Sequence, residues 1–272
     1  MYEAFFGLAR KPFSASPDPS MYVSSPSTER TLKRLTYAAR ENTGGFLLTG
    51  PSGCGKTLLL EKLATGSAAT MEYLFVRAGR MDGDALAAAL LRAAGLVVEA
   101  QAARFLDRNA AMYNFGKYLL GKAGGGKHFT IIIDGAEWVD NDGLSVLEMV
   151  NDLRRDGTFL ATFILAGRES MAKRVVSLVG LRDRFTLSAR VEPLDQEGSA
   201  AFIRGRLTAA GAKKDIFAPE ALGEIFVYSK GIPRRINRVS DLALLTAFGL
   251  EKQSVDSEVM EAVIEELAQS PI

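Results

Sequence analysis

The sequence has little of what builds disulfides, metal clusters or membrane spans. Its 272 residues include one cysteine, Cys54, and one histidine, which excludes an intramolecular disulfide framework and a cysteine zinc cluster. No apolar run approaches the roughly 20 residues that a membrane-spanning helix needs. The opening MYEAFFGLARKPF lacks the basic start and apolar run of a secretory signal. We therefore expect a cytoplasmic protein that does not insert into a membrane directly.

Net charge is also nearly absent. The 33 basic and 32 acidic residues give a formal charge of +1, so no global field draws the protein onto nucleic acid or an anionic membrane. Hydrophobic residues make up 47% of the chain, which is enough to bury a full core at this length. We expect a folded protein, on which any nucleic-acid binding would need a local basic surface.

The first two thirds of the chain alternate between strand and helix patterns. Short apolar runs predict buried parallel strands, and helical periodicity separates them. The predicted strands cover residues 46–49, 72–78, 129–134, 159–166 and 186–191. Such alternation implies a parallel sheet with right-handed crossovers, whose carboxyl edge binds ligands. We predict an α/β fold with a five-stranded parallel sheet, followed by a small C-terminal helical lid.

Three segments divide the chain. An arm rich in proline and aromatic residues, followed by a helix, covers residues 1–41; the α/β core covers 42–193; and the lid covers 194–272. Within the core, helical patterns cover 83–121 and 144–155.

A glycine-rich octet lies between the first strand and the helix that follows it. GPSGCGKT at residues 50–57 matches the phosphate-loop pattern G-x-x-x-x-G-K-[ST]. Its glycines let backbone amides curl around phosphates, Lys56 neutralises the β and γ charge, and the Thr57 hydroxyl reaches Mg²⁺. The predicted nucleotide contacts in this segment are Gly50, Pro51, Ser52, Gly53, Cys54, Gly55, Lys56, Thr57 and Leu58. No guanine-reading motif such as Asn-Lys-x-Asp appears, but this alone does not decide between ATP and GTP.

An acid ends the third predicted strand. Asp134 closes the run FTIIID, where P-loop ATPases place the carboxylate that orders Mg²⁺ and its water. Hydrolytic relatives commonly carry a glutamate next, which polarises the attacking water, but Gly135 stands there. Glu137 reaches that water only if the loop turns back, as glycine allows; the alternative is a solvent-facing loop acid. Hydrolysis is therefore expected to be slow, partner-dependent or absent.

Two groups of arginines are candidates for phosphate contact, because a guanidinium presents paired donors to phosphate oxygens. Arg182 and Arg184 precede the fifth strand, and Arg234, Arg235 and Arg238 follow the sequence Gly-Ile-Pro. Spacing alone does not separate phosphate contact from a solvated surface.

These motifs resemble the AAA+ ATPases of the general secretion pathway protein A (ExeA) family, which includes similar proteins of MSHA-type pilus biogenesis and of exosortase loci. The arm YEAFFGLARKPFSASPDPSMYVSS is similar to the family's opening, and GGFLLTGPSGCGKT, FILAGRESM and GIPRRINRVSDLALLTAF resemble its phosphate loop, fourth strand and lid. The resemblance covers nearly the whole chain. It implies an ATP-driven P-loop module that controls assembly of a secretion, pilus or surface-polymer export machine.

The resemblance also implies roles for particular residues. Arg234 is similar to the sensor arginine of the lid, which contacts bound nucleotide. Arg184 is similar in place to an arginine that reaches a neighbouring subunit's γ-phosphate, so a homo-oligomer is implied. Arg168 occupies the place of a polar first sensor, where the family often has glutamine. The segment from Asp134 to Glu137 reads Asp-Gly-Ala-Glu, where the family usually has Asp-Glu-Ala-Gln.

Partners and rival functions follow from the same resemblance. The expected partner is a protein of a membrane-associated secretion or pilus system, which would hold this chain at the inner membrane. Longer family members carry a transmembrane segment and a cell-wall-binding domain beyond the lid; this chain stops near Ile272, so direct peptidoglycan binding is not expected.

Two alternative functions remain open. One is a nucleotide-dependent DNA-binding regulator, since transposition-targeting ATPases share a similar core and lid. The other is a nucleotide-locked scaffold without useful turnover.

Overall fold

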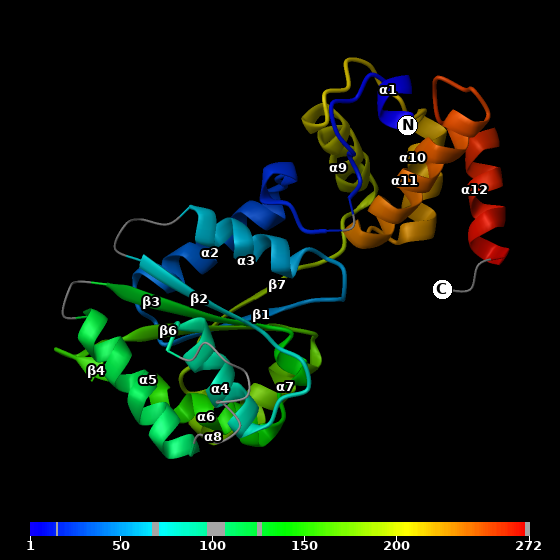
Figure 1. The fold of residues 1–272 in the computed structure, drawn as a ribbon. Coiled ribbons are helices and arrows are strands. Elements are labelled where there is room, and N and C mark those ends of the chain that lie inside the picture. Colours follow the sequence, from blue (N-terminus) through cyan, green and yellow to red (C-terminus); the bar gives the residue numbers. More distant parts are fainter. Residues whose placement is uncertain (15, 67–70, 97–106, 124–126, 270–272) are drawn as a thin grey trace. The chain divides into compact units, whose positions relative to one another are not determined.

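The computed structural model covers the chain with short gaps (Figure 1). The described residues are 1–14, 16–66, 71–96, 107–123 and 127–269. Their contacts group them into two compact units. The core unit contains Ser27–Pro51 and Leu59–Val191, and the lid unit contains Met1–Pro26, Ser52–Leu58 and Glu192–Ile272. The arm and the middle of the octet thus group with the lid helices, while the predicted boundaries at residues 41/42 and 193/194 stay predictions.

The core unit is built on a five-stranded sheet. Its strands are β1 (Gly45–Thr49), β2 (Met71–Arg77), β3 (His128–Asp134), β6 (Ala161–Gly167) and β7 (Leu187–Arg190), in the order β2-β3-β6-β1-β7. Every neighbouring pair is parallel. β1 lies between β6 and β7, and all five of its residues are buried, as expected for a continuous apolar run. The predicted five-stranded parallel sheet is confirmed.

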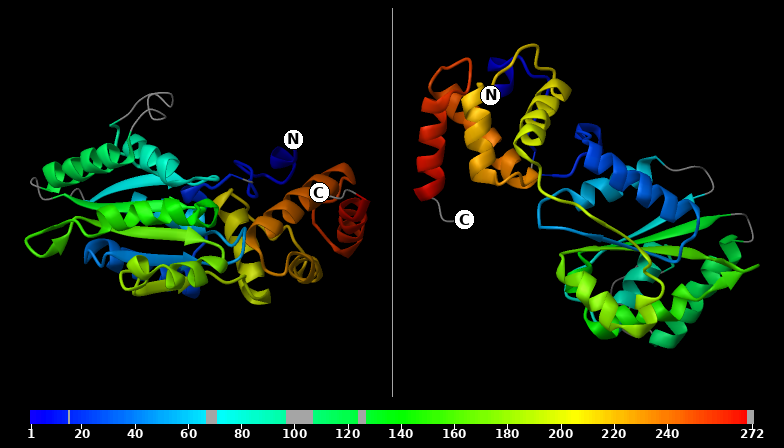
Figure 2. Two further views of the ribbon diagram at one scale, coloured as in Figure 1. Left: turned by 90° about the horizontal axis from the view of Figure 1, so that it is seen from below. Right: turned by 180° about the vertical axis from the view of Figure 1, so that it is seen from behind.

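Helices cover both faces of this sheet (Figures 1 and 2). One face carries α2 (Pro26–Arg40) and α3 (Lys56–Thr65). The other carries α4 (Gly83–Ala93), α5 (Arg108–Ala123), α6 (Asn141–Asn151), α7 (Ser170–Ser177) and α8 (Val179–Arg182). Aspartates begin two of these helices, since Asp82 accepts from the Ala85 N–H and Asp140 from the Gly143 N–H, each satisfying a first-turn donor.

Alternate residues of the central strands face the two helical layers. Leu47, Ile131 and Phe163 join the apolar cluster that contains α4, α5 and α6. On the other face, the Thr162 hydroxyl donates to the Ala38 carbonyl in α2 at 3.2 Å. Successive side chains of a strand point to opposite faces, so a sheet covered on both sides needs apolar residues at nearly every position.

The predicted helix over 144–155 is wrong at its C-terminal end. α6 ends at Asn151, and β4 (Arg154–Arg155) pairs antiparallel with β5 (Thr158–Phe159). Between them, Asp156 and Gly157 have φ of 52° and 79°, which suits a two-residue hairpin turn. The Asp-Gly pair is the sequence signal for this hairpin. Of the predicted helical region 83–121, residues 97–106 lie outside the described residues.

Four helices form the C-terminal part of the lid unit up to residue 269, where the described residues end. They are α9 (Gln196–Ala209), α10 (Pro219–Ser229), α11 (Pro233–Gly249) and α12 (Ser257–Gln269). Asp195 accepts from the Gly198 N–H at 2.7 Å and begins α9. Proline occupies the first position of α10 and of α11, where no N–H is needed. The predicted helical lid is confirmed, and none of the described helices is both long and apolar enough for a membrane span.

The N-terminal arm packs on the lid helices. It contains the short helix α1 (Tyr2–Phe5) and the 3₁₀ turn η1 (Pro19–Met21). Side chains of the arm share one apolar cluster with α9, α10, α11 and α12. The ring of Phe13 meets that of Phe217 edge-on, with centroids 6.1 Å apart, and Phe5 meets Phe248 in the same way at 5.3 Å. The aromatic residues of the arm therefore fix it against the lid helices.

Replacing Phe13 with alanine should destabilise the lid unit. The Phe13 side chain is 3% exposed, and truncating a buried phenylalanine costs about 3–5 kcal/mol. Denaturant unfolding followed by far-ultraviolet circular dichroism measures the loss in free energy of unfolding. Tyr113→Ala is the matched control, because this aromatic ring on α5 is 67% exposed and its loss should cost less than about 0.5 kcal/mol. Equal losses in the two variants would contradict the arm's packing role.

Candidate nucleotide-binding site

The carboxyl ends of the central strands meet at one edge of the sheet. The register places Asp134 of β3 beside Ala166 of β6, and Thr49 of β1 beside both Gly167 of β6 and Arg190 of β7. Open parallel α/β sheets bind ligands at this edge. The predicted Mg²⁺ ligand Asp134 and the start of the octet thus lie at the same edge of the core unit.

The start of the octet packs closely against Val191, the residue that follows β7. The Val191 N–H donates to the Thr49 carbonyl at 2.8 Å. A Cβ on Gly50 would lie 2.2 Å from the Val191 carbonyl oxygen. No side chain fits at such a distance, so the first glycine of the octet is required by the close approach of the neighbouring backbone.

The middle of the octet contacts the first turn of α11 within the lid unit. The Arg234 N–H donates to the Gly53 carbonyl at 3.2 Å, and Arg234 Nη1 lies 3.4 Å from Ser52 Oγ. A Cβ on Gly53, where φ is +86°, would approach the Cβ of Arg234 to 2.9 Å and Cγ2 of Ile232 to 3.0 Å. The structure therefore brings the predicted sensor arginine together with the predicted phosphate loop.

The Gly-Ile-Pro turn sets the position of Arg234. Gly231 has φ of +71°, and its carbonyl accepts from the Leu194 N–H at 2.9 Å. A Cβ on Gly231 would lie 1.8 Å from the Leu194 carbonyl oxygen. Pro233 then begins α11, so Arg234 falls in the first helical turn with its side chain exposed.

The chemistry of the octet fits a nucleoside triphosphate with Mg²⁺. Lys56 and Thr57 are the first two residues of α3, and a helix N-terminus favours anions. Gly55 has φ of +94°, and a Cβ there would meet no atom within 4 Å, so the space beside the loop is open. The Thr57 hydroxyl and the Asp134 carboxylate are hard oxygen donors, which Mg²⁺ takes together with water and phosphate oxygens.

A left-handed glycine follows Asp134. Gly135 has φ 82° and ψ 30°, and its N–H donates to the Ala166 carbonyl at 2.9 Å. A Cβ at this position would lie 3.0 Å from the Ala78 carbonyl oxygen. A glutamate here would combine an unfavourable backbone conformation with a close contact. A glutamate directly after Asp134, where hydrolytic P-loop ATPases commonly carry one, therefore does not fit this backbone.

Glu137 lies in the 3₁₀ turn η3 (Ala136–Trp138), and the solvent-facing alternative for it is wrong. Its side chain is 17% exposed, with Oε1 3.4 Å from Nε of Arg168. Its Oε2 is buried without a hydrogen-bond partner among the described residues. The pairing of Glu137 with Arg168 had no signal in the sequence, because the two residues meet only through the neighbouring strands β3 and β6.

Arg184 is bound within its own chain. Its Nε donates to Oδ1 of Asp152 at 2.9 Å, its Nη2 to the second oxygen of the same carboxylate, and its Nη1 to the Gly180 carbonyl. The hydrogen bond from Arg184 holds the pKa of Asp152 below its usual value. To reach a neighbouring subunit, Arg184 would have to leave these partners, so its role between subunits stays a prediction.

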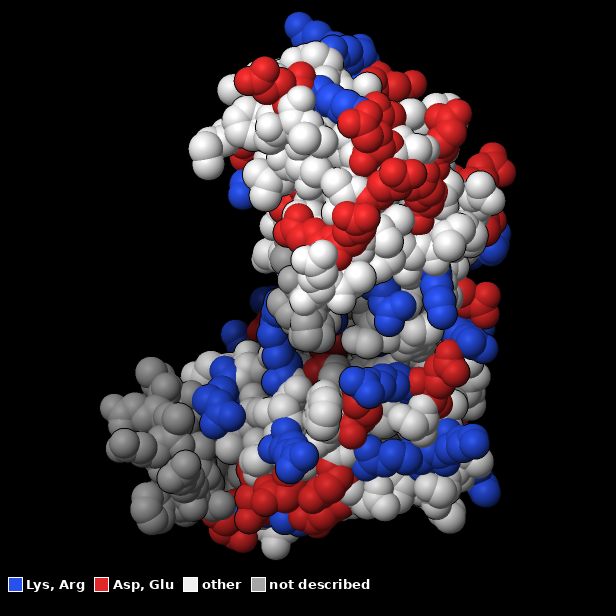
Figure 3. Space-filling model, turned by 90° about the vertical axis from the view of Figure 1, so that its right-hand side faces the viewer, with Lys and Arg blue, Asp and Glu red and all other residues white. Residues whose placement is uncertain are grey.

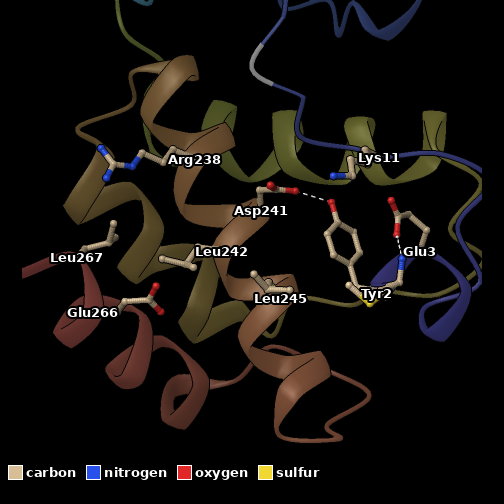
Figure 4. A pocket seen from close by; sticks show the side chains of 10 residues that line it. Tyr2, Glu3, Lys11, Arg238, Asp241, Leu242, Leu245, Glu266 and Leu267 are labelled. Carbon is tan, nitrogen blue, oxygen red and sulfur yellow. Dashed lines mark hydrogen bonds and ion pairs between the residues drawn. The ribbon is translucent and has the colours of Figure 1, made fainter. Parts of the chain in front are cut away.

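Arg238, the last of the lid arginines, lines a separate pocket of about 460 Å³ (Figure 4). The pocket lies between the arm and the helices α11 and α12. Tyr2 donates a hydrogen bond to Asp241 on its wall, and Lys11 and Glu266 add charges of both signs. This mixed lining gives no preference for phosphate.

Comparisons with known proteins identify the class. A family model described as AAA domain matches residues 39–175, just over half of the chain. Cdc6p from Pyrobaculum aerophilum has a TM-score of 0.75 at 16% identity, over 93% of this chain and 70% of that one. The ORC2 protein of Aeropyrum pernix, solved as ADPNP-ADP complexes, has a TM-score of 0.72 at 15% identity, over 97% and 72%. The chain belongs to the AAA domain family and has the fold of the P-loop ATPases.

A curated relative adds a more specific similarity. General secretion pathway protein A of Aeromonas hydrophila is 30% identical over 251 residues, which cover 91% of this chain. The match spans 45% of the relative's length. The resemblance to the general secretion pathway protein A family that the motifs indicate is confirmed.

Replacing Gly53 with alanine should weaken nucleotide binding about tenfold. The added Cβ would clash with the first turn of α11 and strain the backbone, and strain of about 1–3 kcal/mol corresponds to a loss of this order. Calorimetric titration with ATP and Mg²⁺ measures the dissociation constant. Gly249→Ala is the control, because a Cβ there meets no atom within 4 Å. Unchanged affinity in Gly53→Ala would contradict the assigned position of the loop.

Proposed function

We propose that this protein binds ATP with Mg²⁺ and hydrolyses it slowly, or faster when a partner stimulates it. Its nucleotide state would control assembly of a secretion, pilus or surface-polymer export machine. The observation that carries the proposal is the contact between Arg234 and the Ser52-Gly53 segment of the phosphate loop. An arginine at this place can respond to the phosphates and transmit the response to α11. The nucleotide complexes of one structural neighbour and the name of the curated relative support it.

The proposed partners also follow from that relative. We assign the protein to the cytoplasm as a homo-oligomer, held at the inner membrane by a protein of a secretion or pilus system. The match to less than half of the relative's length makes the whole relative's activity a proposal for this chain.

Each residue of the site has a proposed task. The loop amides and Lys56 would hold the phosphates, and Arg234 would sense them. Thr57 and Asp134 would hold Mg²⁺, which neutralises phosphate charge when bound. In hydrolysis, a water oxygen bonds to the γ-phosphorus, the bond from that phosphorus to the bridging oxygen of ADP breaks, and a base takes the proton. We assign the base role to Glu137, because position 135 carries no side chain and Glu137 is the next acid.

Slow turnover is consistent with the surroundings of that carboxylate. Oε2 of Glu137 is buried, and its Oε1 lies near Arg168. A base must lie within hydrogen-bond reach of the water that it activates, directly or through one water. The side chain would have to move before catalysis, which favours a weak basal rate over a fast one.

Lys56→Ala should abolish most ATP binding. A charge-assisted hydrogen bond contributes about 1.5–3 kcal/mol, so we expect the dissociation constant to rise roughly 10- to 150-fold. Titration calorimetry with ATP and Mg²⁺ measures it. Lys173→Ala is the matched control, because Lys173 is an exposed lysine on α7. Wild-type affinity in Lys56→Ala would overturn the site assignment.

Arg184 acting between subunits can be tested by mixing two inactive variants. Lys56→Ala supplies Arg184 but binds ATP only weakly, whereas Arg184→Ala binds ATP but lacks the arginine. If the arginine acts on a neighbour's γ-phosphate, the mixture should hydrolyse ATP several-fold faster than either variant alone, because arginines that act in this way contribute strongly to rate.

The control for this mixture is Arg155→Ala, which removes an exposed arginine of β4. This variant alone should keep the wild-type rate. A mixture of Lys56→Ala and Arg184→Ala that is no faster than the sum of its parts would contradict action between subunits.

A nucleotide-dependent DNA-binding function is the second candidate. Arg234, Arg235 and Arg238 are exposed at the start of α11, which favours it locally. Against it, acidic side chains gather on the face of the lid unit that Figure 3 shows. Helix α12 of this unit carries four exposed acids, Glu258, Glu261, Glu265 and Glu266. A salt-dependent shift of duplex DNA in gel electrophoresis with ATP present would favour this candidate, and no shift at low salt would dismiss it.

A further inference from the structure

The backbone after Asp134 is anchored on three sides. The Ala78 N–H donates to the Asp134 carbonyl at 2.7 Å, and the Gly135 N–H donates to the Ala166 carbonyl in β6 at 2.9 Å. Arg174 of α7 donates to the carbonyls of Glu137 at 3.3 Å and Val139 at 2.7 Å. With the backbone held in this way, the place of the Glu137 carboxylate is set by rotation of its own side chain.

That side chain lies over the last residue of β6. A Cβ on Gly167 would be 2.8 Å from Oε2 of Glu137, so the carboxylate occupies space that any larger residue would take. The other oxygen, Oε1, lies 3.4 Å from Nε of Arg168. The Arg168 guanidinium also lies 5.9 Å from the ring centroid of Trp138, at cation-π distance. Gly167, the last residue of β6, and Arg168, which follows it, thus determine where the carboxylate rests.

One oxygen of the carboxylate is closed to water in this resting place, and the carboxylate is weakly held. Oε2 of Glu137 is buried and receives no hydrogen bond from the described residues, which is unfavourable for a carboxylate oxygen. The Arg168 side chain is 57% exposed, and an exposed ion pair contributes little stability. The carboxylate can therefore leave when either restraint is removed.

We infer that Gly167 and Arg168 are positioning residues that keep the Glu137 carboxylate away from water and so limit ATP hydrolysis. The inference rests on the proposed ATPase function and on Glu137 as its base. Gly167 provides the space that the carboxylate occupies, and Arg168 provides the charge that keeps it there. Neither residue needs to touch the nucleotide for this effect.

Two variants remove the restraints separately. Gly167→Ala fills the space with a Cβ at a φ outside the left-handed region, although the Cβ would also lie 2.8 Å from Cγ of the buried Met171, whose side chain must shift. Arg168→Ala removes the charge at an exposed site, where misfolding is not a concern. Each variant should raise kcat for ATP about 3- to 10-fold with KM unchanged. The increase should vanish when Glu137→Gln is added to either variant, because only a released carboxylate can take the proton.

Arg155→Ala is the control, since it removes an arginine of similar exposure and should leave kcat at the wild-type value. An unchanged or lower kcat in both Gly167→Ala and Arg168→Ala overturns the inference, and so does an increase that persists with Glu137→Gln. These outcomes leave ATP binding and wild-type turnover intact, so the proposed function survives them. If ATP binds but no protein in the series hydrolyses it, both the hydrolytic function and the inference fail.

Discussion

The parallel hydrogen-bond ladder through β1 is the constraint on which the rest of the core unit depends. β1 pairs with β6 on one side and with β7 on the other, and all its residues are buried. Because the strands are parallel and in register, Asp134 at the end of β3 lies at the same edge as the points where the octet follows β1 and Arg168 follows β6. A slip of one residue in this ladder would turn every side chain to the opposite face and would separate these groups.

The same ladder explains why so much could be predicted from the sequence. Continuous apolar runs predict strands buried on both faces, and the octet predicts the junction of β1 with α3. The Gly-Ile-Pro-Arg segment predicts an arginine at the start of a lid helix, and the structure places Arg234 against the loop. The apolar spacing of α6 does not reveal the hairpin at Asp156 and Gly157, because it suggests that the helix continues, whereas α6 ends at Asn151.

Contacts between distant segments could not be predicted in this way. The ion pair of Glu137 with Arg168 joins residues that follow the neighbouring strands β3 and β6, and spacing along the chain does not reveal strand order. The hydrogen bonds from Arg184 to Asp152 also join residues that are far apart in the sequence, so spacing along the chain does not reveal them either. At Gly135, the positive φ and the contact with the Ala78 carbonyl show why a larger residue does not fit this position. The next acid along the turn, Glu137, lies where other side chains bury one of its carboxylate oxygens.

The most direct test of the central claim is a crystal structure of the protein with Mg²⁺ and a non-hydrolysable ATP analogue. The account predicts the triphosphate against the backbone amides of the octet, with Nζ of Lys56 and the guanidinium of Arg234 within hydrogen-bond distance of its oxygens. A nucleotide bound elsewhere, or an Arg234 side chain that remains on Ser52 and does not contact the phosphates, would contradict it.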